Sequence, residues 1–316
     1  MKYIVTGAAG FIGSHLCERL LDLGHDVAGI DAFVPYYPRA VKEQNLSVAR
    51  GNRRFTFHQL DLSVDALEPI VAEADVVVHL AAMPGLDRGW VDFEGYSSCN
   101  VLATQRLLAA VCAACRPLPQ FVYGSTSSVY GSFASGNEDL PLRPISPYGV
   151  TKVAAEHLCS AYREAFALPA VVLRFFSVYG PRQRPDMGYH RFVRALLLGE
   201  PVTVYGQGDQ VRGNTYVADC VEAAVLAAGA ESGRTYNVGG GETASVWDIL
   251  EKLATIAGRR PVIRREPERR GDQRHTFADI TKIRRELGWE PRVKLDEGLA
   301  RQWEWQAAEL GARSRS

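Results

Sequence analysis

A glycine-rich turn near the amino end constrains the fold of this chain more than any other feature. The residues Thr6-Gly7-Ala8-Ala9-Gly10-Phe11-Ile12-Gly13 follow an apolar run at 3–6 and open an apolar pattern with helical spacing. Gly7 and Gly10 permit a tight turn that brings backbone N–H groups close to a phosphate, and Gly13 lets the helix pack against the strand. Such spacings also arise by chance, so the strand before the turn and the helix after it carry the prediction of a dinucleotide site.

An acidic residue closes the second predicted strand, at 26–30. It is Asp31, 18 residues beyond Gly13. A carboxylate in this place hydrogen-bonds the 2′-hydroxyl of an adenine ribose and repels a 2′-phosphate, which predicts NAD rather than NADP. We expect the cofactor to contact the glycine turn and the ends of the second, third and fourth strands: Gly7, Gly10, Phe11, Ile12, Gly13, Asp31, Asp61, Leu62, Leu80, Ala81 and Ala82.

Short apolar runs alternate with helical patterns through the first part of the chain. Strands are predicted at 3–6, 26–30, 54–59, 76–80, 120–123 and 170–174, with helices at 11–23, 66–73, 96–114 and 148–166. Runs without alternation suit strands buried on both faces, so the fold class is α/β with a doubly wound, Rossmann-type parallel sheet. Beyond this part we expect helices at 189–198, 217–229, 245–257, 279–287 and 295–310. The pattern predicts a NAD-binding domain at 1–175 and a smaller, mainly substrate-binding α/β lobe at 176–316, with the chain crossing back between the lobes.

The composition excludes several other classes of function. Lys plus Arg equals Asp plus Glu, at 36 each, which gives no support for binding to nucleic acid or to a membrane surface. No apolar stretch approaches the ~20 residues of a membrane helix, and the chain starts directly with a strand, so we expect a cytoplasmic protein. The six cysteines are scattered; Cys112 and Cys115 lack the further ligands of a zinc site, so no metal is expected.

A second group of residues has the composition of a catalytic site. Tyr148 and Lys152 lie one turn apart on one face of a predicted helix. A lysine ammonium beside a phenol lowers the phenol pKa from about 10, which makes the phenolate a credible general base. The hydroxyls of 125–128 follow the fifth strand, at the sheet edge where ligands bind. Taken alone, each pattern also fits a solvated helix start or a polar turn.

In combination these residues resemble the extended short-chain dehydrogenase/reductases, in the branch of NAD-dependent sugar-nucleotide epimerases and dehydratases. The resemblance covers residues 1–310 and includes the Arg174-Phe175-Phe176-Ser177-Val178-Tyr179-Gly180-Pro181 segment. It implies that Tyr148 takes a proton from a sugar hydroxyl, usually at C4, and that Lys152 binds the nicotinamide ribose. It implies that Thr126 hydrogen-bonds the same hydroxyl. Hydride would pass from C4 to bound NAD, the 4-keto sugar would rotate, and the hydride would return.

Two features point to one member of that family. Family dehydratases carry an acidic pair after the position of Thr126, and decarboxylases carry a Glu at its second residue, whereas this chain has Ser127 and Ser128. The segment 181–187 resembles the loop of the UDP-glucuronate 4-epimerases, where an arginine at the position of Arg184 faces the uronate carboxylate. A guanidinium fork suits a carboxylate, and a firm grip would slow the loss of CO₂ from a 4-keto uronate, which is a β-keto acid.

Further substrate contacts follow from the resemblance. Arg212 and Arg269 match arginines that bind the diphosphate, and Ser177 looks more like the uronate branch than the Asn of many galactose epimerases. The loop at 83–88 departs from the family, because its arginine is displaced and Asp87 intrudes, but we retain Pro84 as a contact. The resemblance therefore predicts a UDP-glucuronate 4-epimerase, whose UDP-sugar substrate is UDP-glucuronate or UDP-galacturonate. The family also implies a homodimer formed through helices 96–114 and 148–166. The alternatives are a neutral UDP-hexose or UDP-N-acetylhexosamine 4-epimerase, a UDP-glucuronate decarboxylase, and a non-catalytic NAD-binding sensor.

Overall fold

The larger part of the molecule is a parallel sheet of seven strands in the order β11-β7-β5-β4-β1-β2-β3. The computed structural model describes residues 1–313. The strands are β1 (Lys2–Thr6), β2 (Asp26–Ile30), β3 (Phe55–His58), β4 (Val76–His79), β5 (Gln120–Thr126), β7 (Ala170–Phe175) and β11 (Thr235–Val238). Every adjacent pair is parallel. The predicted doubly wound α/β fold is therefore confirmed.

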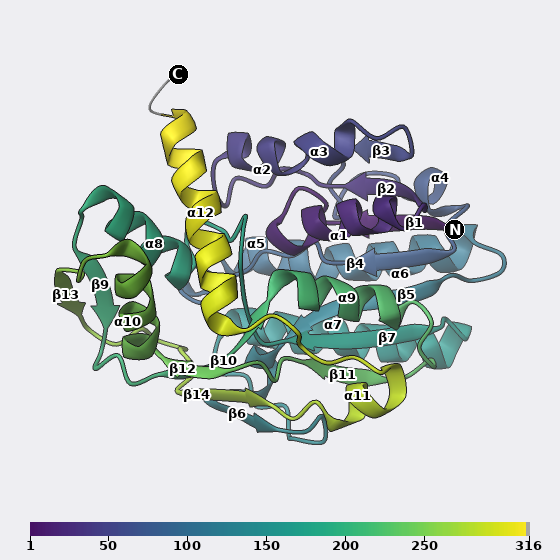
Figure 1. Ribbon diagram of the computed structural model, residues 1–316. Coiled ribbons are helices and arrows are strands. Elements are labelled where there is room, and N and C mark those ends of the chain that lie inside the picture. Colours follow the sequence, from purple (N-terminus) through teal and green to yellow (C-terminus); the bar gives the residue numbers. More distant parts are fainter. Residues whose placement is uncertain (314–316) are drawn as a thin grey trace.

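Helices cover both faces of this sheet, because side chains along each strand point alternately to the two sides. Tyr3 and Val5 of β1 belong to one apolar cluster, with α1 (Phe11–Asp22) and α9 (Val217–Ala227), while Ile4 belongs to the other. That second cluster includes α4 (Glu68–Val71), α6 (Ala103–Ala114) and α7 (Pro147–Phe166). In Figure 1, α1 and α9 lie in front of the sheet and the fainter α6 and α7 lie behind it. Between β2 and β3 run α2 (Arg39–Asn45) and α3 (Ser47–Arg50).

The smaller part contains a mixed five-stranded sheet and a two-stranded sheet. The first consists of β12 (Thr243–Ser245), β10 (Val211–Tyr216), β14 (His275–Ala278) and β6 (Phe133–Gly136), with β8 (Ser177–Tyr179) paired to β10. The second pairs β9 (Val202–Tyr205) with β13 (Ile263–Glu266). Its helices are α8 (Gly188–Leu198), α10 (Val246–Ala257) and the long α12 (Leu295–Arg313), which is the yellow helix at the front of Figure 1. The helix α11 (Thr281–Leu287) packs near β11 at the edge of the large sheet.

The chain passes between the two parts repeatedly, since β6 joins the small lobe before β7 returns to the large sheet, and β11 returns to the large sheet after β10. A cut at residue 175 therefore separates most, but not all, of the two lobes, and the division stays a proposal. The strands after residue 175 were not predicted, because their runs are short and interrupted by Gly and Pro.

The prediction of a single regular helix at 96–114 is wrong. This segment consists of α5 (Phe93–Ser97), a π-helical turn at Ser98–Leu102 and then α6. The buried Asn100 side chain in that turn accepts from Met83 N at 2.6 Å and donates to Thr151 Oγ1 at 3.0 Å. A π turn inserts one residue and re-aims a side chain, and here it fixes the loop after β4. The predicted helix at 66–73 shrinks to the four residues of α4.

Candidate active site

One cavity of about 740 Å³ lies at the carboxyl ends of the large sheet and extends into the small lobe. All the residues predicted to bind cofactor or substrate, or to act in catalysis, line it. They are Gly7, Gly10, Phe11, Ile12, Gly13, Asp31, Asp61, Leu62, Leu80, Ala81, Ala82, Pro84, Thr126, Ser127, Ser128, Tyr148, Lys152, Ser177, Arg184, Arg212 and Arg269. The fold thus gathers segments that are up to 262 residues apart, from Gly7 to Arg269, around one space.

The glycine turn between β1 and α1 forms a cradle that side chains would fill. Gly7 has φ +70°, and a Cβ on Gly13 would lie 2.1 Å from the Gly7 carbonyl oxygen. Gly10 caps α1 without a side-chain hydrogen bond, so the first N–H groups of the helix are not satisfied by a cap. These donors and the positive helix end suit the pyrophosphate of a dinucleotide.

Asp31 closes β2 beside the glycine turn, and its side chain is only 9% exposed. The carboxylate accepts hydrogen bonds from Ala9 N at 3.1 Å and Phe33 N at 2.8 Å. A carboxylate has about four acceptor positions, so two remain for a ribose hydroxyl. The Lys42 ammonium lies 3.9 Å from Asp31, and burial lowers its pKa while Asp31 opposes that shift. Lys42 lines the cavity but was not predicted, since nothing in the sequence places α2 at this strand end.

Two further predicted contacts have defined surroundings. The Oδ1 atom of Asp61 accepts from the backbone N of Ser63 at 2.8 Å and from its hydroxyl at 2.6 Å. The other carboxylate oxygen of Asp61, Oδ2, takes no part in the hydrogen bonds with Ser63. The Pro84 carbonyl accepts a hydrogen bond from the hydroxyl of the buried Tyr96. The loop after β4 is therefore held by α5 as well as by Asn100.

Tyr148 lies in the first turn of α7, and Ser146 caps that helix by accepting from Gly149 N at 3.1 Å. Burial raises the pKa of Tyr148, and the positive charge of Arg184 and a hydrogen bond with Thr126 oppose this. Lys152 was expected to lower this pKa. Its ammonium instead donates to the Gly124 carbonyl at 2.5 Å and lies 4.3 Å from the centroid of the Tyr123 ring.

The pKa of Lys152 is itself lowered to about 7 by burial, and the nearby Glu156 carboxylate only partly offsets this. The charged form of Lys152 is therefore destabilised by burial. Among residues 1–313, no carboxylate is in direct contact with its ammonium. A group that brings further acceptors, such as the ribose of a nucleotide, would relieve that cost.

The hydroxyl run at 125–128 ends β5 and begins a 3₁₀ turn at Ser127–Tyr130, rather than forming a polar loop open to solvent. The Thr126 Oγ1 atom accepts from Ser128 N at 3.2 Å and caps the turn. Ser127 is buried and donates to Gln273 Oε1 at 3.1 Å, while the Gln273 amide donates to the Ser127 and Gly131 carbonyls. Gln273, from the small lobe, therefore fixes this turn; it was not predicted because no local pattern links it to β5.

Each of the three predicted substrate arginines has an aspartate partner. Arg184 pairs with Asp186 at 2.9 Å, Arg212 with Asp272 at 2.8 Å, and Arg269 with Asp87 at 3.6 Å. Asp186 and Asp272 also line the cavity, as does Asp87. Arg182 does not line it and pairs with Glu18 of α1 at 2.8 Å. The aspartates were missed as site residues, although two of them stand within three residues of a predicted arginine.

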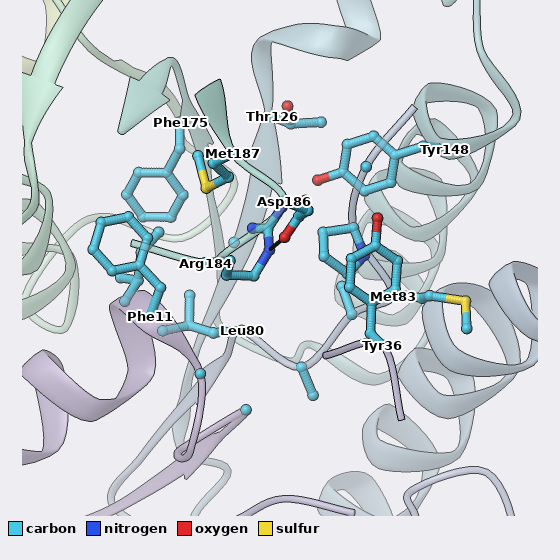
Figure 2. A pocket seen from close by; sticks show the side chains of 18 of the residues that line it. Phe11, Tyr36, Leu80, Met83, Thr126, Tyr148, Phe175, Arg184, Asp186 and Met187 are labelled. Carbon is cyan, nitrogen blue, oxygen red and sulfur yellow. Dashed lines mark hydrogen bonds and ion pairs between the residues drawn. The ribbon is translucent and has the colours of Figure 1, made fainter. Parts of the chain in front are cut away.

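Two tyrosines complete the wall of the cavity, Tyr36 and Tyr37 from the loop after β2. The Arg184 guanidinium carbon lies 6.0 Å from the Tyr36 ring centroid. Figure 2 shows Tyr36 and Tyr148 on one side of the Arg184–Asp186 pair, with Phe11 and Phe175 on the other. An aromatic pair in the loop that follows a strand of a parallel sheet is the signal that could have identified these residues.

The glycine turn, Tyr148 and Lys152 all lie in the part of the chain that matches a known family. The profile of the NAD dependent epimerase/dehydratase family matches residues 3–239. The chain belongs to this family. The family depends on NAD, which confirms the cofactor predicted from Asp31 and makes the protein an NAD-dependent enzyme of the epimerase family.

Several known proteins are similar to this chain over almost its whole length. UDP-glucuronic acid 4-epimerase from Bacillus cereus, solved with UDP-glucuronic acid and NAD, is 42% identical with a TM-score of 0.94, over 98% of this chain and 100% of that one. The uncharacterized UDP-glucose epimerase YtcB of Bacillus subtilis (strain 168) is 44% identical over 95% of this chain and 96% of its own length. A dTDP-glucose 4,6-dehydratase of Streptomyces griseus is 38% identical over 96% and 93%. Overall similarity therefore spans several reactions.

The structure gives no sign of a membrane span or a metal site within the residues that it describes. No helix within residues 1–313 is long and apolar enough to span a membrane. Among the same residues, no cluster of three or more His, Cys, Asp or Glu side chains could hold a metal ion. Cys112 and Cys115 are buried in the apolar cluster around α6, and the Cys115 thiol donates to the Val71 carbonyl.

Proposed function

We propose that this epimerase-family protein is a UDP-glucuronate 4-epimerase, which interconverts UDP-glucuronate and UDP-galacturonate. The observation that carries the proposal is the largely buried Arg184 guanidinium inside the cavity, close enough to Tyr148 for its positive charge to counteract the rise that burial causes in that phenol's pKa. A guanidinium fork in that place suits a carboxylate at C5 of a sugar whose C4 hydroxyl faces Tyr148. The likeness to the Bacillus cereus enzyme supports the same assignment.

The proposed chemistry distributes roles among four side chains. Tyr148 takes the proton of the C4 hydroxyl and later returns it, and Thr126 orients that hydroxyl. Lys152 binds the nicotinamide ribose beneath Tyr148. NAD, held by the glycine turn and Asp31, supplies the acceptor and donor of the C4 hydride and is regenerated. Arg212 and Arg269 bind the diphosphate of the substrate, because they face the same cavity from the small lobe.

The turn after Thr126 argues against the dehydratase and decarboxylase alternatives. Elimination across C5 and C6 needs an acid and a base, and residues 127 and 128 are both serines. The Ser127 hydroxyl is already committed to Gln273 at 3.1 Å. Asp186, which is the carboxylate beside Arg184, is committed to that arginine through two hydrogen bonds.

The deciding experiment compares substrates and one arginine. Wild type and Arg184→Ala are incubated with UDP-glucuronate and, in parallel, with UDP-glucose and UDP-N-acetylglucosamine, and the products are identified by NMR. Loss of a buried ion-pair contact to a carboxylate costs 2–5 kcal/mol, so we expect kcat/KM for UDP-glucuronate to fall by about 30-fold or more. Arg194→Ala, an exposed arginine of α8 paired with Glu200, is the control and should behave as wild type. Undiminished turnover of UDP-glucuronate by Arg184→Ala would refute the proposal.

A neutral UDP-hexose or UDP-N-acetylhexosamine 4-epimerase is the second candidate function. The observation in its favour is the pairing of Arg184 with Asp186, because this pair leaves the sugar part of the cavity without a net charge. The same parallel incubations separate the two candidates: turnover of a neutral UDP-sugar, with UDP-glucuronate left unchanged, would select this second function.

We also infer that the protein forms a homodimer through α6 and α7 and works in the cytoplasm. Leu102, Val150 and Phe166, at the start of α6 and on α7, leave large apolar side chains exposed. All six cysteines are free thiols, which suits a reducing compartment. Light scattering of the purified protein tests the dimer; a monomer mass would contradict it.

A further inference from the structure

Asp186 is the residue of the cavity whose place the proposed reaction does not explain. Its carboxylate accepts from Arg184 Nε at 3.0 Å and from Arg184 Nη2 at 2.9 Å. The pair stands in the middle of the cavity in Figure 2, between Tyr148 and Tyr36 on one side and Phe11 on the other. An aspartate two residues from a substrate-binding arginine can either compete with the substrate for that arginine or hold the arginine in place.

The edge of the guanidinium that Asp186 occupies distinguishes these roles. A guanidinium carries five N–H donors, and Asp186 takes one on Nε and one on Nη2. Among residues 1–313, no acceptor lies on Nη1. Of the three remaining donors, one on Nη1 and one on Nη2 form the terminal edge of the fork, which can bind a second carboxylate with two parallel hydrogen bonds, and the other Nη1 donor points to the Cδ side. Asp186 therefore leaves the substrate-binding edge open.

The backbone before Arg184 is held from several sides. Gln183 is buried; its amide donates to the Val178 carbonyl at 3.0 Å and accepts from His190 N at 2.8 Å. Arg182 adopts the left-handed conformation, with φ 63°, and pairs with Glu18 of the helix that follows the glycine turn. The loop is thus fixed up to the Cα of Arg184, but these contacts do not orient its long side chain.

Asp186 is the hydrogen-bond partner that orients this side chain, among the residues the structure describes. The Arg184 side chain is only 19% exposed, so a charge without a partner would be costly there. Burial lowers the pKa of Arg184, but the adjacent Asp186 carboxylate, together with Tyr36 and Tyr37, raises it above its ordinary value. Asp186 thus supplies both a direction for the fork and a countercharge before any substrate arrives.

We propose that Asp186 is a positioning residue, which holds Arg184 by its Nε edge so that the terminal edge of the guanidinium meets the C5 carboxylate of the sugar. This inference rests on the proposed uronate function. Its consequence concerns the 4-keto intermediate, a β-keto acid. If the carboxylate is held loosely, the C5–C6 bond breaks, CO₂ leaves, and the electron pair passes to the C4 oxygen as an enolate that takes up a proton at C5.

The test measures how the intermediate partitions rather than how fast the enzyme works. Carboxyl-labelled UDP-glucuronate is given to wild type and to Asp186→Ala, and labelled CO₂ is counted against UDP-galacturonate formed. Because small misplacements of a reacting group cost large factors, we expect the ratio of CO₂ to epimer to rise about tenfold or more in Asp186→Ala. Asp186→Asn should lie between wild type and Asp186→Ala, since its amide oxygen keeps one of the two hydrogen bonds.

The control is Asp87→Asn, which removes the partner of Arg269 instead and should keep the wild-type ratio. Calorimetry with UDP alone and a thermal unfolding curve show that each variant folds. The ratio is independent of the fraction of folded enzyme, so a merely structural effect does not change it.

Two results would overturn the inference while leaving the proposed function intact: an unchanged ratio in Asp186→Ala, or tighter binding of UDP-glucuronate by that variant, which would make Asp186 a competitor. A wild-type enzyme that leaves UDP-glucuronate unchanged would instead refute the proposed function, and this inference with it.

Discussion

The two halves of the cavity are lined by different kinds of groups. The half that we assign to NAD consists of backbone and small side chains at the ends of β1, β2 and β4, and its shape depends on glycines. The half that we assign to the sugar and diphosphate consists of three arginines, each paired with an aspartate. The first is shaped by steric exclusion around the glycine turn, and the second by ion pairs, two of which join segments far apart in the chain.

This difference predicts how each half responds to change. A steric cradle is sensitive to added atoms, because an extra methyl group has no room to move. A set of ion pairs is sensitive to lost atoms, because a buried charge left alone is costly. Tyr148 and Lys152 stand where the halves meet, so substitutions there show whether the two halves function independently.

The largest effect is expected for Tyr148→Phe. This change removes the proposed general base and leaves the ring that packs edge-on against Tyr96, with centroids 6.4 Å apart. General acid–base catalysis contributes about 10²–10⁴-fold, so kcat for UDP-glucuronate should fall by that factor. NAD content and UDP affinity, measured by absorbance of the denatured supernatant and by calorimetry, should stay at wild-type values.

Tyr162→Phe is the matched control, since Tyr162 lies on the same helix α7 and its hydroxyl accepts from the Gln105 amide at 2.9 Å, outside the cavity. It should keep wild-type turnover. If Tyr148→Phe retained wild-type kcat, the assignment of the base would be wrong.

The same contrast explains what the sequence could predict. The glycine turn and Asp31 are local patterns whose geometry depends on neighbours in the chain, so the strands around them, the parallel doubly wound sheet and the cofactor were predictable. Arg184, Arg212 and Arg269 were found only through resemblance to a family. Their aspartate partners were missed, and so was Gln273, because its contact with Ser127 joins residues 146 positions apart. The small lobe was the least predictable part, since its strands are short and its pairings are distant in sequence.

The second prediction concerns the steric half, where Gly13→Ala should abolish NAD binding. A Cβ at residue 13 would lie 2.1 Å from the Gly7 carbonyl oxygen, and both atoms belong to the turn itself. Overpacking of this kind costs about 1–3 kcal/mol, which we expect as a lower melting temperature together with loss of copurified NAD. UDP affinity should remain, because the arginines lie in the other half.

Gly229→Ala serves as the control for Gly13→Ala, because the nearest atom to its added Cβ is the Leu226 carbonyl oxygen at 3.8 Å, an ordinary contact. Its melting temperature and NAD content should equal those of the wild type. Wild-type NAD content in Gly13→Ala would show that the turn is not a tight cradle.

The smallest effect is expected for Lys152→Met, where the two halves meet, and it concerns the stability of the cofactor-free protein. The buried Lys152 has a pKa of about 7, below the 10.5 of a free lysine. Between these values the unfolded chain holds a proton that the folded chain lacks, so the wild type gains stability as pH rises from 7 to 10.5 and carries the full cost of the buried charge below pH 7. Lys152→Met removes that charge but also its hydrogen bond to Gly124, so we expect a net gain of about 1–2 kcal/mol at pH 6.

Thermal unfolding from pH 6 to pH 9 measures this difference, which should shrink as pH rises. A variant that is less stable than the wild type at pH 6 would mean that Lys152 stabilises the empty site. In that case Lys152 would support both halves of the empty cavity. It would not be a destabilising buried charge whose cost the bound nucleotide reduces.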